Sequence, residues 1–405
     1  MLNKVPILNV YVITTSRADY GLLYPVLKEL ENDNQFQTYL IACGSHLSKH
    51  HGNTINHIYE DGFKNVIMID TDIRSDTEND LCKSIAAGLN RFSNLLTEKN
   101  PDFIIVLGDR YELWAFCIAA VIHRVPVVHI HGGESTSGVI DDPVRHSISK
   151  MASVHFPVID QYSKRIIQMG ENPRYVFTAG APGIDNIKKV KLLKKEELEK
   201  LLNMNLNDPF ALMTYHPVTL DNYMDAENQI NEVFSALIDI KIKTIITMPN
   251  ADTGNSLIYK VIHKYCNQNP NQFKLFKHLG QQKYLSIMNN TTFMIGNSSS
   301  GIIESASFKL PVVNIGDRQG GRFKPPNVID CPCIKESILN AIKKALSKEF
   351  INTIRDIKNP YGDGKTAKRI VQTLKKIDFS NPELIKKGFH DILETEKSSK
   401  KRESL

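Results

Sequence analysis

Short apolar segments alternate with helix-like segments along most of this 405-residue chain. Residues 9–14, 39–42 and 103–107 are strand-like, and each is followed by a segment with apolar residues at helical spacing. Strands that alternate with helices form right-handed βαβ units around a parallel sheet. The alternation starts again at Phe210, and 405 residues exceed one ordinary domain. We therefore predict two consecutive parallel α/β domains with a cleft between them.

The domain boundaries follow from where this alternation stops and restarts. We place the first domain at residues 1–186, before a stretch rich in Lys and Glu, and the second at residues 187–360. A helix within residues 361–380 is expected to pack back on the first domain. Residues 381–405 are basic and are expected to form a flexible tail.

Composition narrows the range of partners and compartments. The net charge of +6 is small for this length and fits an anionic small-molecule substrate rather than nucleic acid. No apolar run reaches the length of a membrane span. The six cysteines are scattered, and Cys331 with Cys333 makes a poor metal site without a second pair or a nearby His. We expect a cytoplasmic protein with reduced thiols, no membrane partner and no metal.

Residues 293–322 carry the clearest sign of a ligand site in the second half. They predict a strand, a small polar turn, a helix start and a second strand that ends in a basic loop. Backbone N–H groups at such a helix start bind anions, and Arg318 and Arg322 are placed to close over the same anion. Glu304, one turn into the helix, suits neutral hydroxyls such as those of a ribose. We predict a clamp for a nucleotide diphosphate; a Ser-rich helix cap beside a solvated basic loop is the alternative.

Polar clusters in the first half fall at or after the carboxyl ends of predicted strands, where open α/β sheets bind ligands. Their members are Arg17, Asp19, His46, Asp109, Arg110, His131, Glu134, Asp141 and Arg145. Helix caps, local ion pairs and structural histidines explain each cluster taken alone. Together, Asp, Glu and His in one cleft are what proton transfer near neutral pH requires. The motifs of NAD-binding sites, P-loops, serine hydrolases and zinc proteases are absent, which argues against those functions.

Short motifs occur in order from about residue 10 to residue 365. They are Ser16–Gly21, Gly108–Arg110, His129–Glu134, Ile140–His146, His216–Thr219, Pro249–Gly254, Gly296–Gly301 with Glu304, and Gly316–Gln319 with Arg322. Together they resemble the hydrolysing UDP-N-acetylglucosamine 2-epimerases, and most closely those of bacterial sialic-acid biosynthesis.

The resemblance implies a GT-B-like pair of Rossmann-like domains with the active site in the interdomain cleft. It implies that UDP-N-acetylglucosamine (UDP-GlcNAc) and water become UDP and N-acetylmannosamine, by elimination to 2-acetamidoglucal and hydration. Neither a metal nor NAD takes part in that reaction. It also implies a homo-oligomer, either a dimer or a tetramer.

The resemblance also assigns roles by motif position. The residues matched to UDP binding are Arg17, Arg110, His216, Asn250, Ser298, Ser299, Glu304 and Arg318. Asp109 and Asp141 match catalytic carboxylates. Many relatives carry Glu at the position of His131, so either His131 or Glu134 is left as base or acid. Weaker candidates for contact with the sugar are Asp19, His46, Arg145 and Arg322.

Three alternatives stay open at this point. One is a hydrolysing 2-epimerase for UDP-2,4-diacetamido-2,4,6-trideoxyglucose, on the route to legionaminic acid. Another is a GT-B glycosyltransferase, which shares the UDP clamp but needs an acceptor site. The last is a catalytically silent UDP-sugar sensor, against which the acid–base residues argue.

Overall fold

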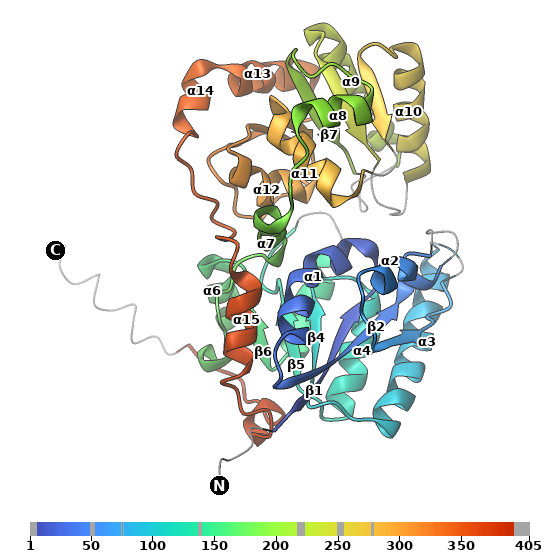
Figure 1. Cartoon of the computed structure of the whole chain (residues 1–405), viewed down its shortest axis with the longest axis vertical. Helices are drawn as coiled ribbons and strands as arrows, with labels where there is room; N and C mark the ends of the chain where they lie inside the picture. Colours follow the sequence, from blue (N-terminus) through green and yellow to red (C-terminus); the bar gives the residue numbers. More distant parts are fainter. Residues whose placement is uncertain are drawn as a thin grey trace, which may run out of the picture.

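Two separate parallel sheets, each between layers of helices, make up the molecule (Figure 1). In this computed structural model the described residues are 6–48, 53–73, 75, 77–136, 140–216, 223–248, 255–276 and 279–392. The predicted fold class, two Rossmann-like α/β domains, is confirmed.

The first sheet has six strands in the order β3-β2-β1-β4-β5-β6. They are β1 (Leu8–Thr14), β2 (Phe36–Cys43), β3 (Val66–Ile69), β4 (Phe103–Leu107), β5 (Val127–Ile130) and β6 (Val154–Phe156). The helices are α1 (Arg17–Glu31), α2 (Ile55–Glu60), α3 (Glu78–Glu98), α4 (Glu112–Ile122), α5 (Asp141–Met151), α6 (Asp160–Gln168) and α7 (Pro182–Lys189), with 3-10 turns η1 (Gly44–Leu47) and η3 (Pro173–Tyr175). The strand order reverses direction between β1 and β4, which is where open sheets of this kind bind ligands.

The two faces of this sheet bury alternate residues of the same strand. Val10 and Val12 pack with residues of α1 and of a helix from the end of the chain. Tyr11 and Ile13 pack on the opposite face with residues of α3 and α4. A strand that is covered on both faces needs a continuous apolar run, and this explains why such runs predict it from sequence.

The second sheet also has six strands, in the order β12-β11-β10-β7-β8-β9. They are β7 (Phe210–Thr214), β8 (Lys243–Thr247), β9 (Phe273–Phe276), β10 (Phe293–Gly296), β11 (Val312–Ile315) and β12 (Val328–Cys331). The helices are α8 (Lys195–Leu202), α9 (Tyr223–Ile240), α10 (Asn255–Gln268), α11 (Gly280–Asn290), α12 (Ser299–Ile303), α13 (Lys335–Leu346) and α14 (Lys348–Thr353), with the 3-10 turn η4 (Ser305–Phe308). The order again reverses direction at its centre, between β7 and β10.

The end of the chain returns to the first domain. Helix α15 (Thr366–Leu374) packs against α1 and α7, and Figure 1 shows it beside the first sheet. The buried Asp185 carboxylate of α7 accepts hydrogen bonds from the backbone N–H of Thr366 (2.9 Å) and Ala367 (2.8 Å). These N–H groups at the helix start have no partner within the helix, so Asp185 fastens α15 to the first domain.

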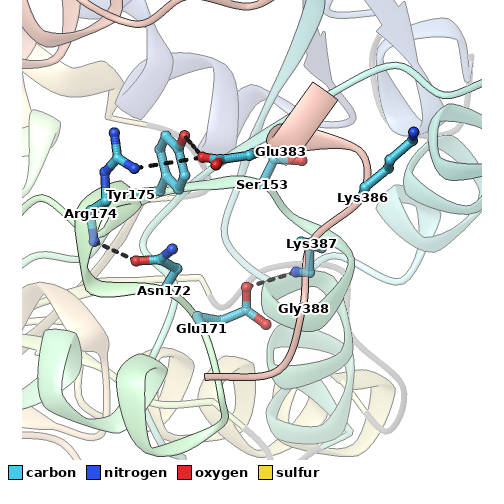
Figure 2. A pocket seen from close by; sticks show the side chains of 9 residues that line it. All are labelled: Ser153, Glu171, Asn172, Arg174, Tyr175, Glu383, Lys386, Lys387 and Gly388. Atoms are coloured by element: carbon cyan, nitrogen blue, oxygen red, sulfur yellow. Dashed lines mark hydrogen bonds and ion pairs between the residues drawn. The ribbon is translucent and has the colours of Figure 1, made fainter. Parts of the chain in front are cut away.

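A C-terminal strap, residues 378–390, continues across the first domain. It contains the 3-10 turn η5 (Pro382–Leu384). The Lys387 ammonium donates to the carbonyls of Lys150 and Ala152, both at 2.6 Å, and to the Glu171 carboxylate at 2.7 Å. A cavity of about 280 Å³ lies between the strap and η3, with Glu171 and Lys387 on its wall (Figure 2). Residues 381–390 of the predicted tail thus lie against the first domain, and residues 393–405 are outside the described part.

Two further properties concern the chain as a whole. Among the described residues, no helix combines the length and apolar character that crossing a bilayer requires. All six cysteines are free thiols, and Cys82 is exposed. In the same described part of the chain, no three His, Cys, Asp or Glu side chains are grouped in a way that would hold a metal ion.

The contacts of Lys387 predict a measurable contribution to stability. Lys387→Met should lower the free energy of unfolding by about 1.5–3 kcal/mol, because hydrogen bonds to a charged group are lost. Burial raises the pKa of Glu171, but His155, Lys150 and Lys387 more than offset this, and the pKa is lowered to about 2. The stabilisation from the Glu171 ion pairs is therefore fully present at pH values above 4.5, the ordinary pKa of a Glu side chain. It is lost as the pH falls toward 2.

Urea denaturation at pH 7 and at pH 3 measures both effects. The matched control is Lys386→Met, since Figure 2 shows the Lys386 side chain directed away from Glu171. Equal stability of the two variants at pH 7 would contradict the role of Lys387.

Candidate active site

A cavity of about 150 Å³ lies between the two domains. The first domain contributes Asp109, Thr136 and Asp141, and the second contributes Ser299, Arg318, Gln319 and Arg322. All of these follow the carboxyl ends of strands in the two sheets. Five of the seven lining residues were predicted from the sequence as site residues, and the cavity brings them together from positions up to 213 residues apart (Asp109 to Arg322, 322 − 109).

The second domain forms the cationic side of this cavity. Strand β10 ends at Gly296, where a Cβ atom would lie 2.0 Å from the Thr214 carbonyl oxygen, so only glycine fits. The next residue, Asn297, is buried, and its side chain bonds the backbone N–H (2.7 Å) and carbonyl (2.8 Å) of His216. Its own carbonyl accepts from Arg318 at 3.2 Å. The turn before α12 is thus fixed to the neighbouring strand end and to the basic loop, as an anion clamp requires.

Arg145 is the buried centre of the first-domain side. Its guanidinium forms an ion pair with Asp109 and donates to the Glu134 carbonyl at 3.1 Å. Burial raises the pKa of Asp109, but the charge and hydrogen bond of Arg145 more than offset this, and the pKa is lowered. The sequence named Arg145 as one of the weaker candidates for contact with the sugar. In the structure Arg145 is buried and pairs with Asp109, whose side chain keeps 25% of its surface exposed and lines the cavity.

His131 and Glu134 form a second buried acid–base group. His131 directly follows β5 and has φ of 65°, a conformation that is costly for a residue with a side chain. Its Nδ1 lies 2.7 Å from Glu134 Oε1, and Glu134 Oε2 accepts from Arg322 Nε at 3.0 Å. Burial raises the pKa of Glu134, while Arg322, His131 and Arg145 lower it well below its usual range. An ionised carboxylate can only accept a hydrogen bond, so His131 Nδ1–H is the donor to Glu134. In the neutral ring with this tautomer, the lone pair is on Nε2.

Two more of the predicted UDP-binding residues lie at the boundary between the domains, and a third, His216, is buried in the second domain. A Cβ atom on Gly280 of the second domain would lie 3.6 Å from the Arg17 guanidinium, and one on Gly183 would lie 3.7 Å from Glu304 Oε1. His216 is buried, and burial, followed by the charge of Arg318, lowers its pKa to about 3. It is therefore neutral at physiological pH.

Other predicted residues have partners within the first domain. Asp19 accepts from the backbone N–H of Thr15 (2.7 Å) and Ser16 (2.6 Å), which makes it part of the cap of α1. His46 is buried between the hydroxyls of Thr14 (3.0 Å) and Thr54 (2.8 Å). Neither of these two residues lines the cavity between the domains.

The last three placements complete the predicted set. Arg110 pairs with Glu112, its neighbour at the start of α4, at 2.9 Å. Ser298 is the residue that precedes α12. Asn250 lies outside the described residues.

Sequence reasoning did not single out Thr136, Asn297 or Gln319. Gln319 and Thr136 line the cavity, and Asn297 holds the clamp turn. The signal for Asn297 and Gln319 was present, because both lie within motifs that carried the resemblance. No comparable signal marked Thr136, since it follows the last residue of its motif by two positions.

Two Rossmann-like domains with a cavity between them define a GT-B-like protein. A solved structure of UDP-GlcNAc 2-epimerase from Neisseria meningitidis has this fold, with a TM-score of 0.77 over 91% of this chain and 100% of that one at 18% identity.

Sequence comparison then specifies the family. The family model described as UDP-N-acetylglucosamine 2-epimerase matches residues 28–375. The chain is 39% identical to a GDP/UDP-N,N'-diacetylbacillosamine 2-epimerase (hydrolyzing) from Campylobacter jejuni, over 94% of this chain and 98% of that protein. It is 37% identical to a UDP-N,N'-diacetylbacillosamine 2-epimerase (hydrolyzing) from Legionella pneumophila, over 90% and 95%. The chain belongs to the UDP-N-acetylglucosamine 2-epimerase family, as its motifs predicted.

The environment of Glu304 predicts a pH dependence of UDP binding. Burial raises the pKa of Glu304 to about 7. If its ionised form accepts from ribose hydroxyls, UDP affinity should rise as the pH increases from 6 to 8. Glu304→Gln should bind UDP more weakly, by about tenfold to a hundredfold, and should lack this component of the pH dependence.

Isothermal titration calorimetry with UDP, carried out on the wild-type protein and on Glu304→Gln from pH 6 to pH 8, measures the difference between their pH profiles. Protonation of UDP itself affects both proteins equally and cancels in this comparison. Parallel pH profiles would show that Glu304 does not contact the nucleotide.

Proposed function

We propose that this protein is a hydrolysing 2-epimerase whose substrate is UDP-N,N'-diacetylbacillosamine, which is UDP-2,4-diacetamido-2,4,6-trideoxyglucose. The reaction class is supported by one observation above all. A single interdomain cavity has Ser299 and Arg318 on one wall and Asp109 and Asp141 on the other. A hydroxyl and a cation thus face two carboxylates across one cavity, which is the arrangement that a sugar linked to a diphosphate would need.

The choice of sugar is supported by the relatives. Both of the proteins compared above by sequence are named for N,N'-diacetylbacillosamine, and each is matched over almost its whole length. UDP-GlcNAc is the second candidate. It is favoured by the description of the family model and by the Neisseria meningitidis enzyme, whose solved structure is bound to UDP-GlcNAc.

The chemistry makes two separate demands on the protein. A base removes the proton from C2 of the sugar while the C1–O bond breaks and its electron pair leaves with UDP. This step forms a 2-acetamidoglucal, and positive groups stabilise the departing diphosphate. Water then adds to C1, and a proton returns to C2 on the opposite face. Because the configuration at C2 inverts, two acid–base groups in different places are required.

The residues are proposed for these roles as follows. Arg318, the N–H groups and hydroxyls at the start of α12, and Glu304 hold UDP. The remaining proposed UDP contacts are Arg17, Arg110, His216 and Asn250. Asp109 and Asp141 act on the sugar from the cavity wall. The His131–Glu134 pair supplies the second acid–base group, with His131 Nε2 as the atom that exchanges a proton.

A substrate comparison tests the proposal. Proton NMR in D₂O should show UDP and 2,4-diacetamido-2,4,6-trideoxymannose formed from UDP-N,N'-diacetylbacillosamine alone, with deuterium at C2. The kcat/KM should exceed that for UDP-GlcNAc by about tenfold or more, because the two sugars differ at both C4 and C6 and a single group in a fitted pocket already contributes about tenfold. Faster turnover of UDP-GlcNAc would establish the second candidate. Binding of UDP without turnover of either sugar would indicate a sensor or a transferase that lacks its acceptor.

The cavity carboxylates predict a loss of turnover without a loss of nucleotide binding. Asp141→Asn and Asp109→Asn should each lower kcat by at least about a hundredfold, since a positioned acid–base group supplies about 10²–10⁴-fold in rate. The Kd for UDP should change by no more than a few-fold. Asp208→Asn is the control, because Asp208 is an exposed carboxylate that pairs with Lys243. A large loss of UDP affinity with unchanged kcat would contradict the roles given to both carboxylates.

A further inference from the structure

Arg322 connects the two domains by side-chain hydrogen bonds to both. It lies in the loop after β11, in the second domain, and its side chain is only 12% exposed. Its Nε donates to Glu134 Oε2 of the first domain at 3.0 Å. Its Nη1 donates to Gln319 Oε1 of its own loop at 2.7 Å. One guanidinium thus donates at the same time to a carboxylate of the first domain, Glu134, and to a side-chain amide of the second domain, Gln319.

The hydrogen bonds continue in both directions from this guanidinium. On the first-domain side, the other oxygen of Glu134 holds His131 Nδ1 at 2.7 Å. On the second-domain side, Gln319 Nε2 donates to the Asn297 carbonyl at 2.8 Å. That carbonyl belongs to the turn that begins α12 and also accepts from Arg318. An unbroken series of hydrogen bonds therefore joins the proposed proton-transfer group to the anion clamp.

The loop that carries Arg322 is fixed on the first domain at both sides of this residue. Gly321 has φ of 80°, and a Cβ atom there would lie 2.9 Å from the Ser135 hydroxyl. The Phe323 backbone N–H donates to the Tyr162 hydroxyl at 3.0 Å. The Gly321 backbone thus lies so close to Ser135, the residue after Glu134, that a side chain at position 321 would not fit. These contacts hold the backbone on both sides of Arg322 next to the first domain, within reach of Glu134.

The His131 ring is the end of the series that faces the chemistry. Its Nε2 is buried and has no hydrogen-bond partner among the described residues. A buried polar atom without a hydrogen bond destabilises the folded protein, unless a ligand or a water molecule supplies that bond. Since Nδ1 is held by Glu134, the ring orientation and the proton position depend on how Glu134 itself is held.

We propose that Arg322 is a positioning residue, which acts through Glu134 to orient His131 and couples that pair to the nucleotide clamp through Gln319. This inference rests on the proposed function. The sequence had suggested Arg322 as part of the anion clamp and as a weaker candidate for contact with the sugar. Lysine would not replace it, because a single ammonium lacks the planar fork that reaches two acceptors in fixed directions.

The charged and titratable groups that face Glu134 decide what the loss of Arg322 does. They are Arg322, His131, Arg145, Asp109, Tyr162 and Tyr361. Burial raises the pKa of Glu134, and the positive charge of Arg322 is the largest effect that lowers it. Removal of Arg322 should therefore raise the pKa of Glu134. Because Glu134 must be ionised to accept the Nδ1 proton, the acidic limb of the pH profile should move to higher pH.

Steady-state kinetics of Arg322→Gln and Arg322→Lys test the proposal with the UDP-sugar that the wild-type protein hydrolyses. Both variants should lose about tenfold or more in kcat, a part of the 10²–10⁴-fold that an acid–base group supplies. Their Kd for UDP should stay within about threefold, and the acidic limb of kcat/KM should shift upward in Arg322→Gln. The control Lys324→Met removes a cation from the same loop that pairs within the second domain, with Asp330, and should change none of these.

A second measurement does not depend on turnover. Nitrogen-15 NMR of the histidine rings, with His131 assigned through His131→Gln, should show its ring signals shift when UDP binds. The shift should persist in Lys324→Met and should be lost in Arg322→Gln and in Gln319→Met, which keeps Arg322 but breaks the connection to Asn297. Gln319→Met also provides the test if Arg322→Gln fails to fold.

The outcomes separate the two proposals. Unchanged kcat in the Arg322 variants, or a large loss of UDP affinity with kcat retained, would overturn the positioning role. If the nitrogen-15 chemical shifts of His131 do not change when UDP binds to the wild-type protein, the coupling is overturned. If the wild-type protein hydrolyses neither UDP-sugar, the proposed function fails, while the NMR response of His131 to UDP still decides the coupling.

Discussion

The buried guanidinium of Arg145 is the interaction on which the first-domain side of the site depends. A buried cation is tolerated only when hydrogen-bonded acceptors surround it, and removal of one partner typically costs about 3–5 kcal/mol. Here the acceptors are Asp109, from the end of β4, and the Glu134 carbonyl, from the loop after β5. Arg145 itself comes from α5, which begins with Asp141. Three separate segments are thus held in one arrangement, and each of them contributes a candidate acid–base group.

The second domain reaches a comparable rigidity by different means. Its clamp turn depends on backbone groups, since Asn297 pairs with both the N–H and the carbonyl of His216. Gly296 permits the required close approach to Thr214. Backbone donors suit a diphosphate, because they are fixed in direction and cannot be neutralised. Proton transfer instead requires titratable side chains, so the different construction of the two halves of the cavity agrees with the roles proposed for them.

Much of this arrangement could be predicted from the sequence. Alternating apolar and helical segments predicted both sheets, and the polar residues after Leu107, Ile130 and Gly296 fell at their carboxyl ends. The partners of those residues could not be predicted. Arg145 lies 36 residues from Asp109, and Arg322 lies 188 residues from Glu134, so only the folded chain shows which charges meet. The structure adds a carboxylate partner for each of these arginines, Asp109 for Arg145 and Glu134 for Arg322.

Two buried carboxylates show how these partners decide chemistry. Burial raises the pKa of both Glu304 and Glu134. At Glu304 this effect prevails, and the pKa lies at about 7. At Glu134, Arg322 and His131 reverse it, and the carboxylate stays ionised. The difference arises largely from one arginine that crosses the domain boundary. Because Arg322 lies on the second domain and Glu134 on the first, the ionisation of Glu134, a group proposed for proton transfer, depends on how the two domains meet.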